Sequence, residues 1–319
     1  KAMANGKTVV LNAARMNYDG NLDMSVLSSE VICYDVTEPD QILERIHGAD
    51  VVVTKEMPVS GEIISQFPDC VKLICEAGTG YNNLDLDAAR AKGITVCNIP
   101  AYSTERVAHT AIMLMLNLSS SMQIQQAMLT KGDRSNFTKC MQVPHVELNG
   151  KKLGIIGAGT IGKAVIRIAQ AMDMEVLAYT RTPREDEEKL KYVDLDTLLA
   201  ESDYISLHCP LTPATRHMIN EETIAKMKPT AFIVNTGRGA LIDEPALIKA
   251  LQEGRIAGAG LDVQETEPPA LDNPLYDMPN VVLTPHMGWK GLETRKRLIA
   301  ILAGNIEGFL SGEPVNVVS

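Results

Sequence analysis

The sequence has no apolar run long enough to cross a membrane, no signal peptide at its start and no excess of basic residues. Its 30 basic and 40 acidic residues give a net charge of −10. That balance argues against general binding to nucleic acid or to an anionic membrane, although a local basic pocket could still bind an anion. We therefore expect a cytoplasmic protein with no nucleic-acid or membrane partner.

Cysteine pairs with disulfide or zinc-ligand spacing are also absent. The six cysteines include no CxxC, and most lie in apolar runs, which predicts buried thiols in a reducing compartment and no metal site. What is present is an ordinary globular composition, with 45% apolar and 22% charged residues over 319 positions. That length suggests two domains. Lys1 and Ala2, which precede Met3, are set aside from the fold reasoning.

A glycine-rich turn between a buried strand and a helix is the most informative local pattern. The apolar run Leu153–Ile156 meets Gly157-Ala158-Gly159-Thr160-Ile161-Gly162; a helix pattern follows to about Met172, then a second apolar run at Val176–Tyr179. In a dinucleotide fingerprint the first glycine makes the turn, the second admits a pyrophosphate and the third lets helix and strand pack closely. The pyrophosphate lies at the helix N-terminus. These flanks favour a dinucleotide site over a turn used only for packing.

Strand-like runs alternate with helix-like segments on both sides of Asn98-Ile99-Pro100, and the alternation restarts at Lys152. Such alternation with short links predicts parallel sheets covered by helices. The predicted strands are Thr8–Asn12, Val31–Asp35, Asp50–Thr54, Val71–Cys75, Ile94–Cys97, Leu153–Ile156, Val176–Tyr179, Tyr204–Leu207, Ala231–Asn235, Ala257–Leu261 and Val281–Thr284. The predicted helices are Asp40–Ile46, Leu84–Ala91, Ser103–Ser120 (apolar nearly all round and so buried), Met122–Thr130, Leu195–Ala200, Glu221–Met227, Glu244–Glu253 and Gly291–Ser311.

The fold class that follows is α/β, with two Rossmann-like or flavodoxin-like domains. Because the N-terminal alternation lacks a closing element, the last helix is expected to cross back to it. Residues 1–100 and 290–319 would form a discontinuous substrate (catalytic) domain, and residues 101–289 an inserted dinucleotide-binding domain that includes the linking helix. A polar arm, Lys131–Glu147, shows no periodicity.

Three charged side chains follow successive predicted strands of the second half. Arg238, Glu267 and His286 come after Ala231–Asn235, Ala257–Leu261 and Val281–Thr284, at the strand ends where α/β proteins bind ligands. An arginine can hold a carboxylate by two hydrogen bonds, and a histidine can exchange a proton with an alcohol or carbonyl oxygen. A glutamate bonded to the imidazole would stabilise its protonated form. Each alone is more often structural, but the set predicts catalysis.

The order of these motifs resembles the D-isomer-specific 2-hydroxyacid dehydrogenase family over nearly the whole chain. The matching segments are EAGTGYNNLDLDAARAKGI at 76–94, GAGTIG at 157–162, HCPLTPATRHMI at 208–219, NTGRGALIDEPAL at 235–247, AGAGLDVQETEPP at 257–269 and TPHMGW at 284–289. The resemblance implies that Arg238 binds a 2-keto acid, that His286 is the acid/base and that Glu267 is its partner. It implies cofactor contacts from Cys209, Pro210, Thr215, Thr236, Gly237, Asp262 (to the nicotinamide amide) and Gly288.

The glycine-rich loop Gly78-Thr79-Gly80 follows a predicted strand, so its backbone N–H groups could point at an anion. Without the resemblance an ordinary turn would be the simpler interpretation; with it, the loop is expected to bind the substrate carboxylate. Trp289, beside His286, resembles the hydroxypyruvate/glyoxylate reductase (glycerate dehydrogenase) branch and would limit the size of the pocket. The remaining histidines are expected to be structural: His208 at the cofactor cleft, His109 in the buried helix, and His47, His145 and His217 at the periphery.

The position that selects between nicotinamide cofactors departs from the NAD pattern. NAD-specific proteins place a carboxylate about 20 residues beyond the glycines to bind the ribose 2′-OH. Here that position is Thr180, followed by Arg181 and Arg184, which could pair with a 2′-phosphate. NADP(H) is therefore the favoured cofactor. NAD(H) stays possible if Arg181 instead stacks on adenine.

The expected activity is hydride transfer between the nicotinamide and C2 of a small 2-keto acid, most simply the reduction of hydroxypyruvate or glyoxylate. Two alternatives stay open: a dehydrogenase for D-lactate or branched 2-keto acids, and a nucleotide-sensing protein similar to corepressors with this fold. Turnover separates the sensor from the enzymes. The resemblance also implies a homodimer, formed through the helices 103–130 and the arm after them.

Overall fold

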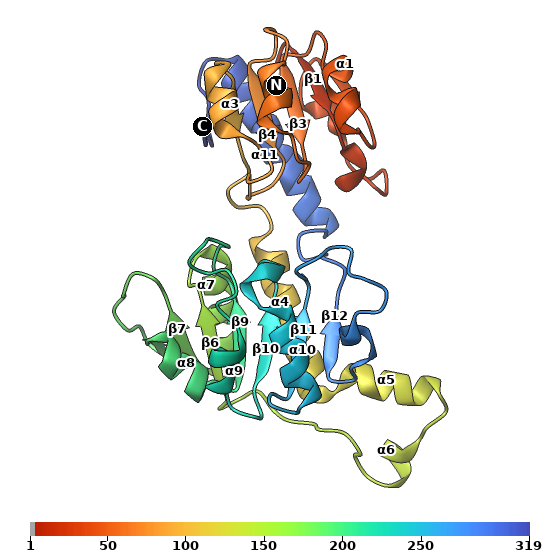
Figure 1. The fold of residues 1–319 in the computed structure, drawn as a ribbon, viewed down its shortest axis with the longest axis vertical. Coiled ribbons are helices and arrows are strands. Elements are labelled where there is room, and N and C mark those ends of the chain that lie inside the picture. The colour runs from red at the N-terminus through yellow and green to blue at the C-terminus, as the bar shows by residue number, and fades with distance from the viewer. Residues whose placement is uncertain (1–3) are drawn as a thin grey trace. The chain divides into compact units, whose positions relative to one another are not determined.

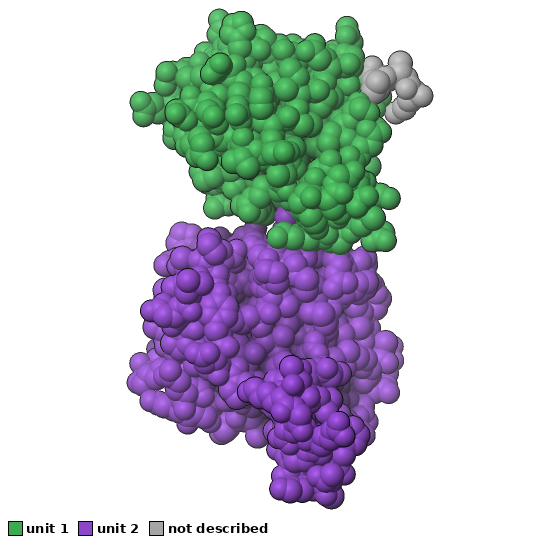
Figure 2. Space-filling view, turned by 90° about the vertical axis from the view of Figure 1, so that its right-hand side faces the viewer, with its two compact units in different colours: residues 1–103, 290–319 green, residues 104–289 purple. Residues whose placement is uncertain are grey.

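The computed structural model describes residues 4–319 and divides into two compact units (Figures 1 and 2). Unit 1 combines the chain up to Ser103 with Lys290–Ser319, and unit 2 is Thr104–Trp289. Lys1 and Ala2, set aside above, lie outside the described residues. Each unit has a parallel β-sheet, as the alternation of strands and helices predicts.

Unit 1 is built on a five-stranded sheet in the order β2-β1-β3-β4-β5, which is the flavodoxin-like arrangement. Its strands are β1 (Lys7–Val10), β2 (Glu30–Cys33), β3 (Val51–Thr54), β4 (Leu73–Glu76) and β5 (Thr95–Cys97). The central strands β3 and β4 are buried at every position, which explains why they read as continuous apolar runs and not as alternating ones.

Four α-helices accompany this sheet: α1 (Ile42–Arg45), α2 (Gly61–Ser65), α3 (Leu86–Ala91) and α11 (Leu292–Leu310). Short 3₁₀ turns lie at Ala13–Arg15, Met24–Val26 and Pro39–Gln41. Helix α11 returns from the end of the chain and packs on β4, with Leu298, Leu302 and Ile306 buried. The segment after α11 reaches β5, where the Val318 N–H donates to the Val96 carbonyl. The last thirty residues therefore complete unit 1.

Unit 2 contains a seven-stranded sheet in the order β12-β11-β10-β9-β6-β7-β8. The chain starts in the middle at β6, runs outward to β8, then returns to β9 and runs outward the other way, which is the Rossmann arrangement. The strands are β6 (Lys152–Ile156), β7 (Glu175–Tyr179), β8 (Leu190–Tyr192), β9 (Tyr204–Leu207), β10 (Phe232–Asn235), β11 (Gly258–Leu261) and β12 (Val281–Leu283). The direction reverses between β6 and β9, where such sheets bind ligands.

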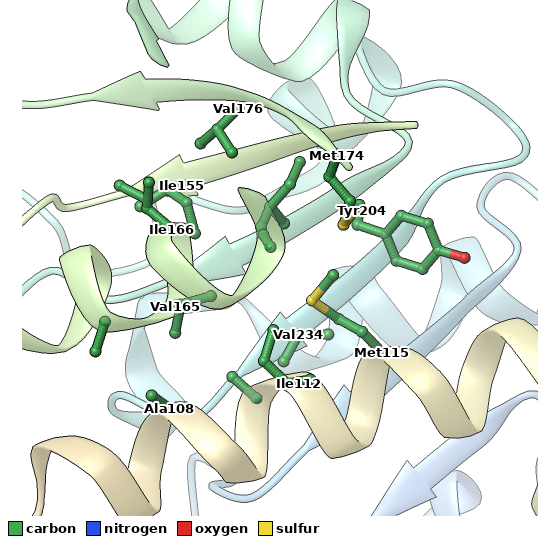
Figure 3. Close-up of a cluster of buried hydrophobic side chains, with 14 of the residues drawn as sticks. Ala108, Ile112, Met115, Ile155, Val165, Ile166, Met174, Val176, Tyr204 and Val234 are labelled. Atoms are coloured by element: carbon green, nitrogen blue, oxygen red, sulfur yellow. The ribbon is translucent and has the colours of Figure 1, made fainter. Parts of the chain in front are cut away.

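The core of unit 2 forms where α4 (Thr104–Ser120) and α7 (Thr160–Ala171) pack together on the sheet. Figure 3 shows this cluster, in which Ile112 and Met115 of α4 meet Val165 of α7 and Val234 of β10. The other helices are α5 (Met122–Thr130), α6 (Ser135–Thr138), α8 (Leu195–Glu201), α9 (Glu221–Ala225) and α10 (Glu244–Gln252), with 3₁₀ turns at Gly239–Leu241 and Pro274–Asp277.

The arm that follows α4 extends away from the sheet of unit 2, carrying α5 and α6 (Figure 1). It presents large apolar side chains to solvent: Phe137 is 78% exposed, and Leu129, Met141 and Val146 are also exposed. Within residues 4–319, no helix combines the length and the apolar character that a membrane span requires.

Some expectations about burial were wrong. Leu116 and His109 on α4 are exposed, because α4 packs on the sheet through one face only. Cys33, Cys70 and Cys140 are exposed thiols, and only Cys75 and Cys97 are fully buried; all six cysteines are unpaired.

Strand β8 and helix α2 were missed, since three and five residues are too few to show a period.

Candidate active site

The glycine-rich turn after β6 has the geometry that a fingerprint requires. Gly157 has φ +95°, and a Cβ there would lie 2.6 Å from the Cys209 nitrogen. A Cβ on Gly162 would lie 2.1 Å from the Gly157 carbonyl oxygen, so helix α7 could not begin this close to β6. At Gly159 a Cβ would meet no atom of the described protein. Packing thus accounts for the first and third glycines, and the space beside the second is open, as the fingerprint requires.

Helix α7 begins without a side-chain cap. The N-termini of α8, α9 and α10 are capped by Asp194, Asn220 and Asp243, whereas α7 starts at Thr160 and its N-cap residue, Gly159, has no side chain that could cap it. The first N–H groups of a helix need an acceptor and carry a partial positive charge, so they favour an anion. A pyrophosphate would supply that acceptor beside Thr160 and Ile161.

The segment after β7 has Thr180 at the position where NAD-specific proteins carry a carboxylate. The Thr180 hydroxyl donates to the Thr182 carbonyl at 2.6 Å, and Arg181 is exposed. The Arg184 Nη1 donates to the Ala158 carbonyl at 3.0 Å, which brings this guanidinium onto the glycine-rich turn itself. Of the two arginines singled out from the sequence, Arg184 is therefore the one that contacts the fingerprint.

The loop after β9 lies next to the turn after β6. The His208 N–H donates to the Ile156 carbonyl, and its Nε2 lies 2.7 Å from the Ser206 hydroxyl; burial lowers the pKa of His208 to about 4. Beyond it, the Thr215 hydroxyl donates to the Pro210 carbonyl at 2.7 Å. Cys209 lies between His208 and Pro210 in the sequence; its thiol is half-buried, and burial raises its pKa. The Thr215 hydroxyl thus stabilises the loop, since it is hydrogen-bonded within the loop itself.

The turn after β10 is shaped by a residue that the sequence analysis did not single out. Asn235 is fully buried; its Oδ1 accepts the Gly237 N–H at 3.0 Å and its Nδ2 donates to the Arg238 carbonyl at 2.9 Å. This leaves the Arg238 side chain exposed. The neighbouring Thr236 hydroxyl is buried with no hydrogen-bond partner among the described residues. A buried orphan hydroxyl is costly, and a bound cofactor would satisfy it.

The histidine and glutamate predicted as a pair do meet. His286 Nδ1 lies 2.7 Å from Glu267 Oε2, and Glu267 Oε1 accepts the Gln264 N–H at 3.0 Å. Partial burial works to raise the pKa of Glu267, but the hydrogen bonds from His286 and Gln264 and the charges of His286 and Arg238 outweigh it and lower that pKa. Glu267 is therefore held as a carboxylate facing the imidazole.

Asp262 fixes the turn that carries His286. Its Oδ1 accepts the Thr284 hydroxyl at 2.7 Å and the Met287 N–H at 2.9 Å, and its Oδ2 accepts the Gly288 N–H at 2.9 Å. Asp262 is 2% exposed. His286 has φ +50°, a left-handed conformation that a non-glycine residue adopts at a cost. The sequence analysis assigned Asp262 only a cofactor contact, and the structure adds this positioning role.

A second histidine–carboxylate pair lies close by in sequence. His217 pairs with the carboxylate of Glu265, which lies two residues before Glu267. The backbone N–H of Glu265 donates to the carboxylate of Glu244. The side chain of His217 is 34% exposed, and the sequence did not reveal its partner. The pair joins the loop after β9 to the loop after β11, and no local pattern could reveal a contact between segments this far apart.

In unit 1, the loop after β4 is anchored to the protein through its carbonyl groups and not through its N–H groups. Within residues 4–319, the N–H groups of Gly78, Thr79 and Gly80 donate to no protein acceptor, while the carbonyls of Gly78 and Thr79 accept from Ile99 and Asn98. Gly78 is buried and Thr79 is exposed. Unpaired N–H groups in sequence form the kind of nest that binds carboxylates.

Beneath that loop lies a buried polar cluster that the sequence analysis missed. Lys55 is 1% exposed, and its Nζ lies 3.0 Å from the Tyr102 hydroxyl. A Cβ on Gly78 would approach this Nζ to 3.1 Å, so a glycine suits the position. Glu76 is fully buried, and burial raises its pKa against hydrogen bonds from Thr54, Glu56 and Asn83 that lower it.

The residues of unit 2 fit a dinucleotide. The glycine turn, the uncapped start of α7 and the orphan Thr236 hydroxyl would hold it, and Asp262 and Gly288 lie at the turn that carries His286. Trp289 follows directly and is buried. This arrangement is that of a dinucleotide-binding domain, with the His286–Glu267 pair in the loops that follow β11 and β12.

Comparisons with known proteins agree. Residues 112–288 match the family model described as the NAD-binding domain of D-isomer-specific 2-hydroxyacid dehydrogenases. The chain is 43% identical to a hydroxypyruvate reductase of Blautia hydrogenotrophica (98% and 99% of the two chains) and 40% identical to a glycerate dehydrogenase of Methylorubrum extorquens (88% of each). It resembles the solved structure of a glyoxylate reductase from Paecilomyes thermophila, with TM-score 0.84 and 33% identity over 99% of both chains.

The chain belongs to the D-isomer-specific 2-hydroxyacid dehydrogenase family. This confirms the resemblance seen in the motifs, and it makes the chain an oxidoreductase that acts on small 2-hydroxy or 2-keto acids with a nicotinamide cofactor.

Proposed function

We propose that this protein reduces hydroxypyruvate to D-glycerate or glyoxylate to glycolate. The observation that carries the proposal is the His286–Glu267 pair, at 2.7 Å, on a sheet that also carries Arg238 and a dinucleotide turn. The names of the relatives support the choice of substrate, since they include hydroxypyruvate, glycerate and glyoxylate enzymes.

In this proposal the chain's own residues bind the keto acid and move one proton. The exposed guanidinium of Arg238 holds the substrate carboxylate by two hydrogen bonds. Protonated His286 donates its proton from Nε2 to the C2 oxygen, and Glu267 on Nδ1 fixes the ring and stabilises its positive charge. The nicotinamide, when bound, supplies the hydride.

The loop Gly78-Thr79-Gly80 of unit 1 is proposed as a substrate-binding element that accepts a carboxylate. The N–H groups of Gly78, Thr79 and Gly80 lack protein acceptors in the described residues, and a carboxylate would supply them. Trp289 is assigned to limit the group at C3, which favours small keto acids over branched ones.

We assign NADP(H) as the preferred cofactor, with NAD(H) as the alternative. Thr180 stands where a carboxylate would repel a 2′-phosphate, and Arg184 is held on the glycine-rich turn through the Ala158 carbonyl. Arg181, exposed beside it, is the second cation.

A homodimer formed through α5 and the arm after it is also proposed, because that arm exposes Phe137 and further apolar side chains. The free cysteines favour a reducing compartment, and we assign the protein to the cytoplasm on that basis.

The proposal is tested by initial rates of NADPH and NADH oxidation with hydroxypyruvate, glyoxylate and pyruvate, for the wild type and for His286→Ala. We expect the first two acids to be reduced fastest, and His286→Ala to lose about 10²–10⁴-fold in rate while it still binds cofactor. Pyruvate as the best substrate would transfer the assignment to a lactate-type enzyme. Cofactor binding without turnover of any acid would favour a nucleotide sensor.

A further inference from the structure

We call Gly78-Thr79-Gly80 the substrate loop. Hydrogen bonds to its carbonyl groups fix its orientation. In unit 1, the Ile99 N–H donates to the Gly78 carbonyl at 3.0 Å, and Asn98 Nδ2 donates to the Thr79 carbonyl at 2.9 Å. In a trans peptide the C=O and the following N–H point in opposite directions. Anchoring the carbonyls of Gly78 and Thr79 therefore fixes the directions of the Thr79 and Gly80 N–H groups, which lack protein acceptors within residues 4–319.

Asn98 is itself held by two other asparagines. Asn305 on α11 donates from Nδ2 to the Asn98 carbonyl at 2.8 Å, and its Oδ1 accepts from Asn316 Nδ2 at 2.7 Å. The Asn316 carbonyl accepts the Asn98 N–H at 3.1 Å. A continuous hydrogen-bond path thus leads from the C-terminal segment through α11 to the loop, entirely within unit 1.

The position of Asn305 is unusual for a polar side chain. It is 1% exposed on the buried face of α11, between Leu302 and Ile306, which are fully buried. A leucine there could be buried without any hydrogen-bond requirement, whereas an amide must be satisfied. The Nδ2 of Asn305 donates to Asn98 and its Oδ1 accepts from Asn316, so both polar atoms of its amide are hydrogen-bonded. A fully satisfied path of hydrogen bonds has few alternative arrangements, so it favours a single orientation of Asn98.

We propose that Asn98, Asn305 and Asn316 form an asparagine relay that positions the substrate loop and so sets the affinity for the carboxylate of the keto acid. The inference rests on the proposed function, because it assumes that the loop binds that carboxylate. The three are positioning residues: they hold the loop's peptide groups and take no part in proton transfer.

The test measures KM, kcat and the dissociation constant of oxalate, an unreactive carboxylate, for Asn98→Ala, Asn305→Leu and Asn316→Ala. We expect Asn98→Ala to raise KM and the oxalate constant about tenfold, as for one lost hydrogen bond to an anion-binding element. The other two variants should raise both by smaller factors. The kcat and the dissociation constant of NADPH should change less than about twofold, because the cofactor residues belong to unit 2.

Leu302→Ala is the matched control, since it truncates a buried α11 side chain outside the relay. If it raises KM as much as Asn305→Leu at an equal loss of melting temperature, general loosening explains the effect and the relay is overturned. Unchanged KM in all three asparagine variants overturns it as well. Adding Asn305→Leu to Asn98→Ala should raise KM little further, because both act through one path; fully multiplicative effects would contradict the proposal.

The oxalate measurement separates this inference from the proposed function. A wild type that reduces no keto acid refutes the function, yet a weakened oxalate site in Asn98→Ala would still support the relay. A wild type that reduces keto acids normally but whose variants bind oxalate normally refutes the relay alone. Failure of the wild type to bind oxalate at all overturns the relay, because the loop would then hold no carboxylate.

Discussion

His286 occupies a left-handed backbone conformation, which costs a non-glycine residue about 1–3 kcal/mol. The three hydrogen bonds that Asp262 accepts from Thr284, Met287 and Gly288 offset that cost. His286, the acid/base that we propose, is thus placed by a buried carboxylate that need not take part in the proton transfer itself.

Replacing that carboxylate tests its role. In Asp262→Asn one oxygen becomes a donor that faces an N–H or O–H donor, so at least one bond to the turn is lost. We expect kcat for keto-acid reduction to fall about 10–100-fold, in line with the 1.5–3 kcal/mol of a hydrogen bond to a charged group. Thr284→Val, which removes one of the three bonds, is the graded control and should lose less. Wild-type kcat in Asp262→Asn would refute the positioning role.

The lowered pKa of Glu267 makes a prediction about pH. Because this carboxyl stays ionised below the ordinary glutamate value of about 4.3, it should keep its charge throughout pH 5–9. The rate of reduction should then show no acid limb from Glu267 above about pH 4.3. In Glu267→Gln the imidazole of His286 loses its carboxylate partner, so kcat/KM should fall while cofactor binding is kept. A wild-type kcat/KM in Glu267→Gln would separate Glu267 from the proton transfer.

At this scale the sequence predicted that Arg238, Glu267 and His286 act together, because charged side chains follow successive strands. The structure brings His286 and Glu267 together, and the catalytic roles of all three stay predictions. The sequence could not reveal the second role of Asp262, the shaping of the turn by Asn235 or the His217–Glu265 pair. Each of these is a contact with backbone or with a distant loop, and such contacts leave no local spacing in the chain.

Among the elements, the segment after β7 is the one that we propose selects between NADP(H) and NAD(H). Thr180 leaves the position without a negative charge, and Arg184 is bound to the glycine-rich turn. The element is polar and exposed, so its sequence is free of packing constraints and its charges are available to a ligand.

Introducing a carboxylate at position 180 should reverse the proposed preference for NADPH over NADH. We expect Thr180→Asp to raise KM for NADPH about tenfold or more, through repulsion of the 2′-phosphate, and to leave KM for NADH unchanged or lower. Arg181→Ala should weaken NADPH alone. Arg167→Ala, an exposed arginine of α7 that pairs with Glu105, is the control and should alter neither constant. Equal effects of Arg181→Ala on both cofactors would instead indicate stacking on adenine.

Most elements were predictable because buried parallel strands are apolar throughout and helices have caps and a period. Tyr204–Leu207 and Met122–Thr130 were placed with their observed bounds. The misses have physical reasons: β8 has one buried residue, Leu190, and α2 follows Pro58 and begins at Gly61, residues that indicate a break.

At the scale of the whole molecule, we propose that the exposed apolar side chains of the arm are covered by a second copy of the chain. Monomeric proteins rarely expose contiguous apolar patches, and an aromatic residue exposed to 78% adds nothing to stability. We expect Phe137→Asp to shift the mass measured by light scattering from a dimer toward a monomer, with the fold retained by circular dichroism. Glu147→Asp, a conservative change on the same arm, is the control. A monomeric wild type, or an undisturbed dimer in Phe137→Asp, would contradict the proposed interface.

The central claim is that this chain reduces a small 2-keto acid at C2, with the proton from His286. The most direct measurement supplies hydroxypyruvate with NADPH deuterated at the transferred position and analyses the product by mass spectrometry and chiral chromatography. Our account predicts D-glycerate with one deuterium at C2, formed by the wild type and lost with His286→Ala. An L-product, a product without deuterium at C2 or full activity in His286→Ala would contradict it.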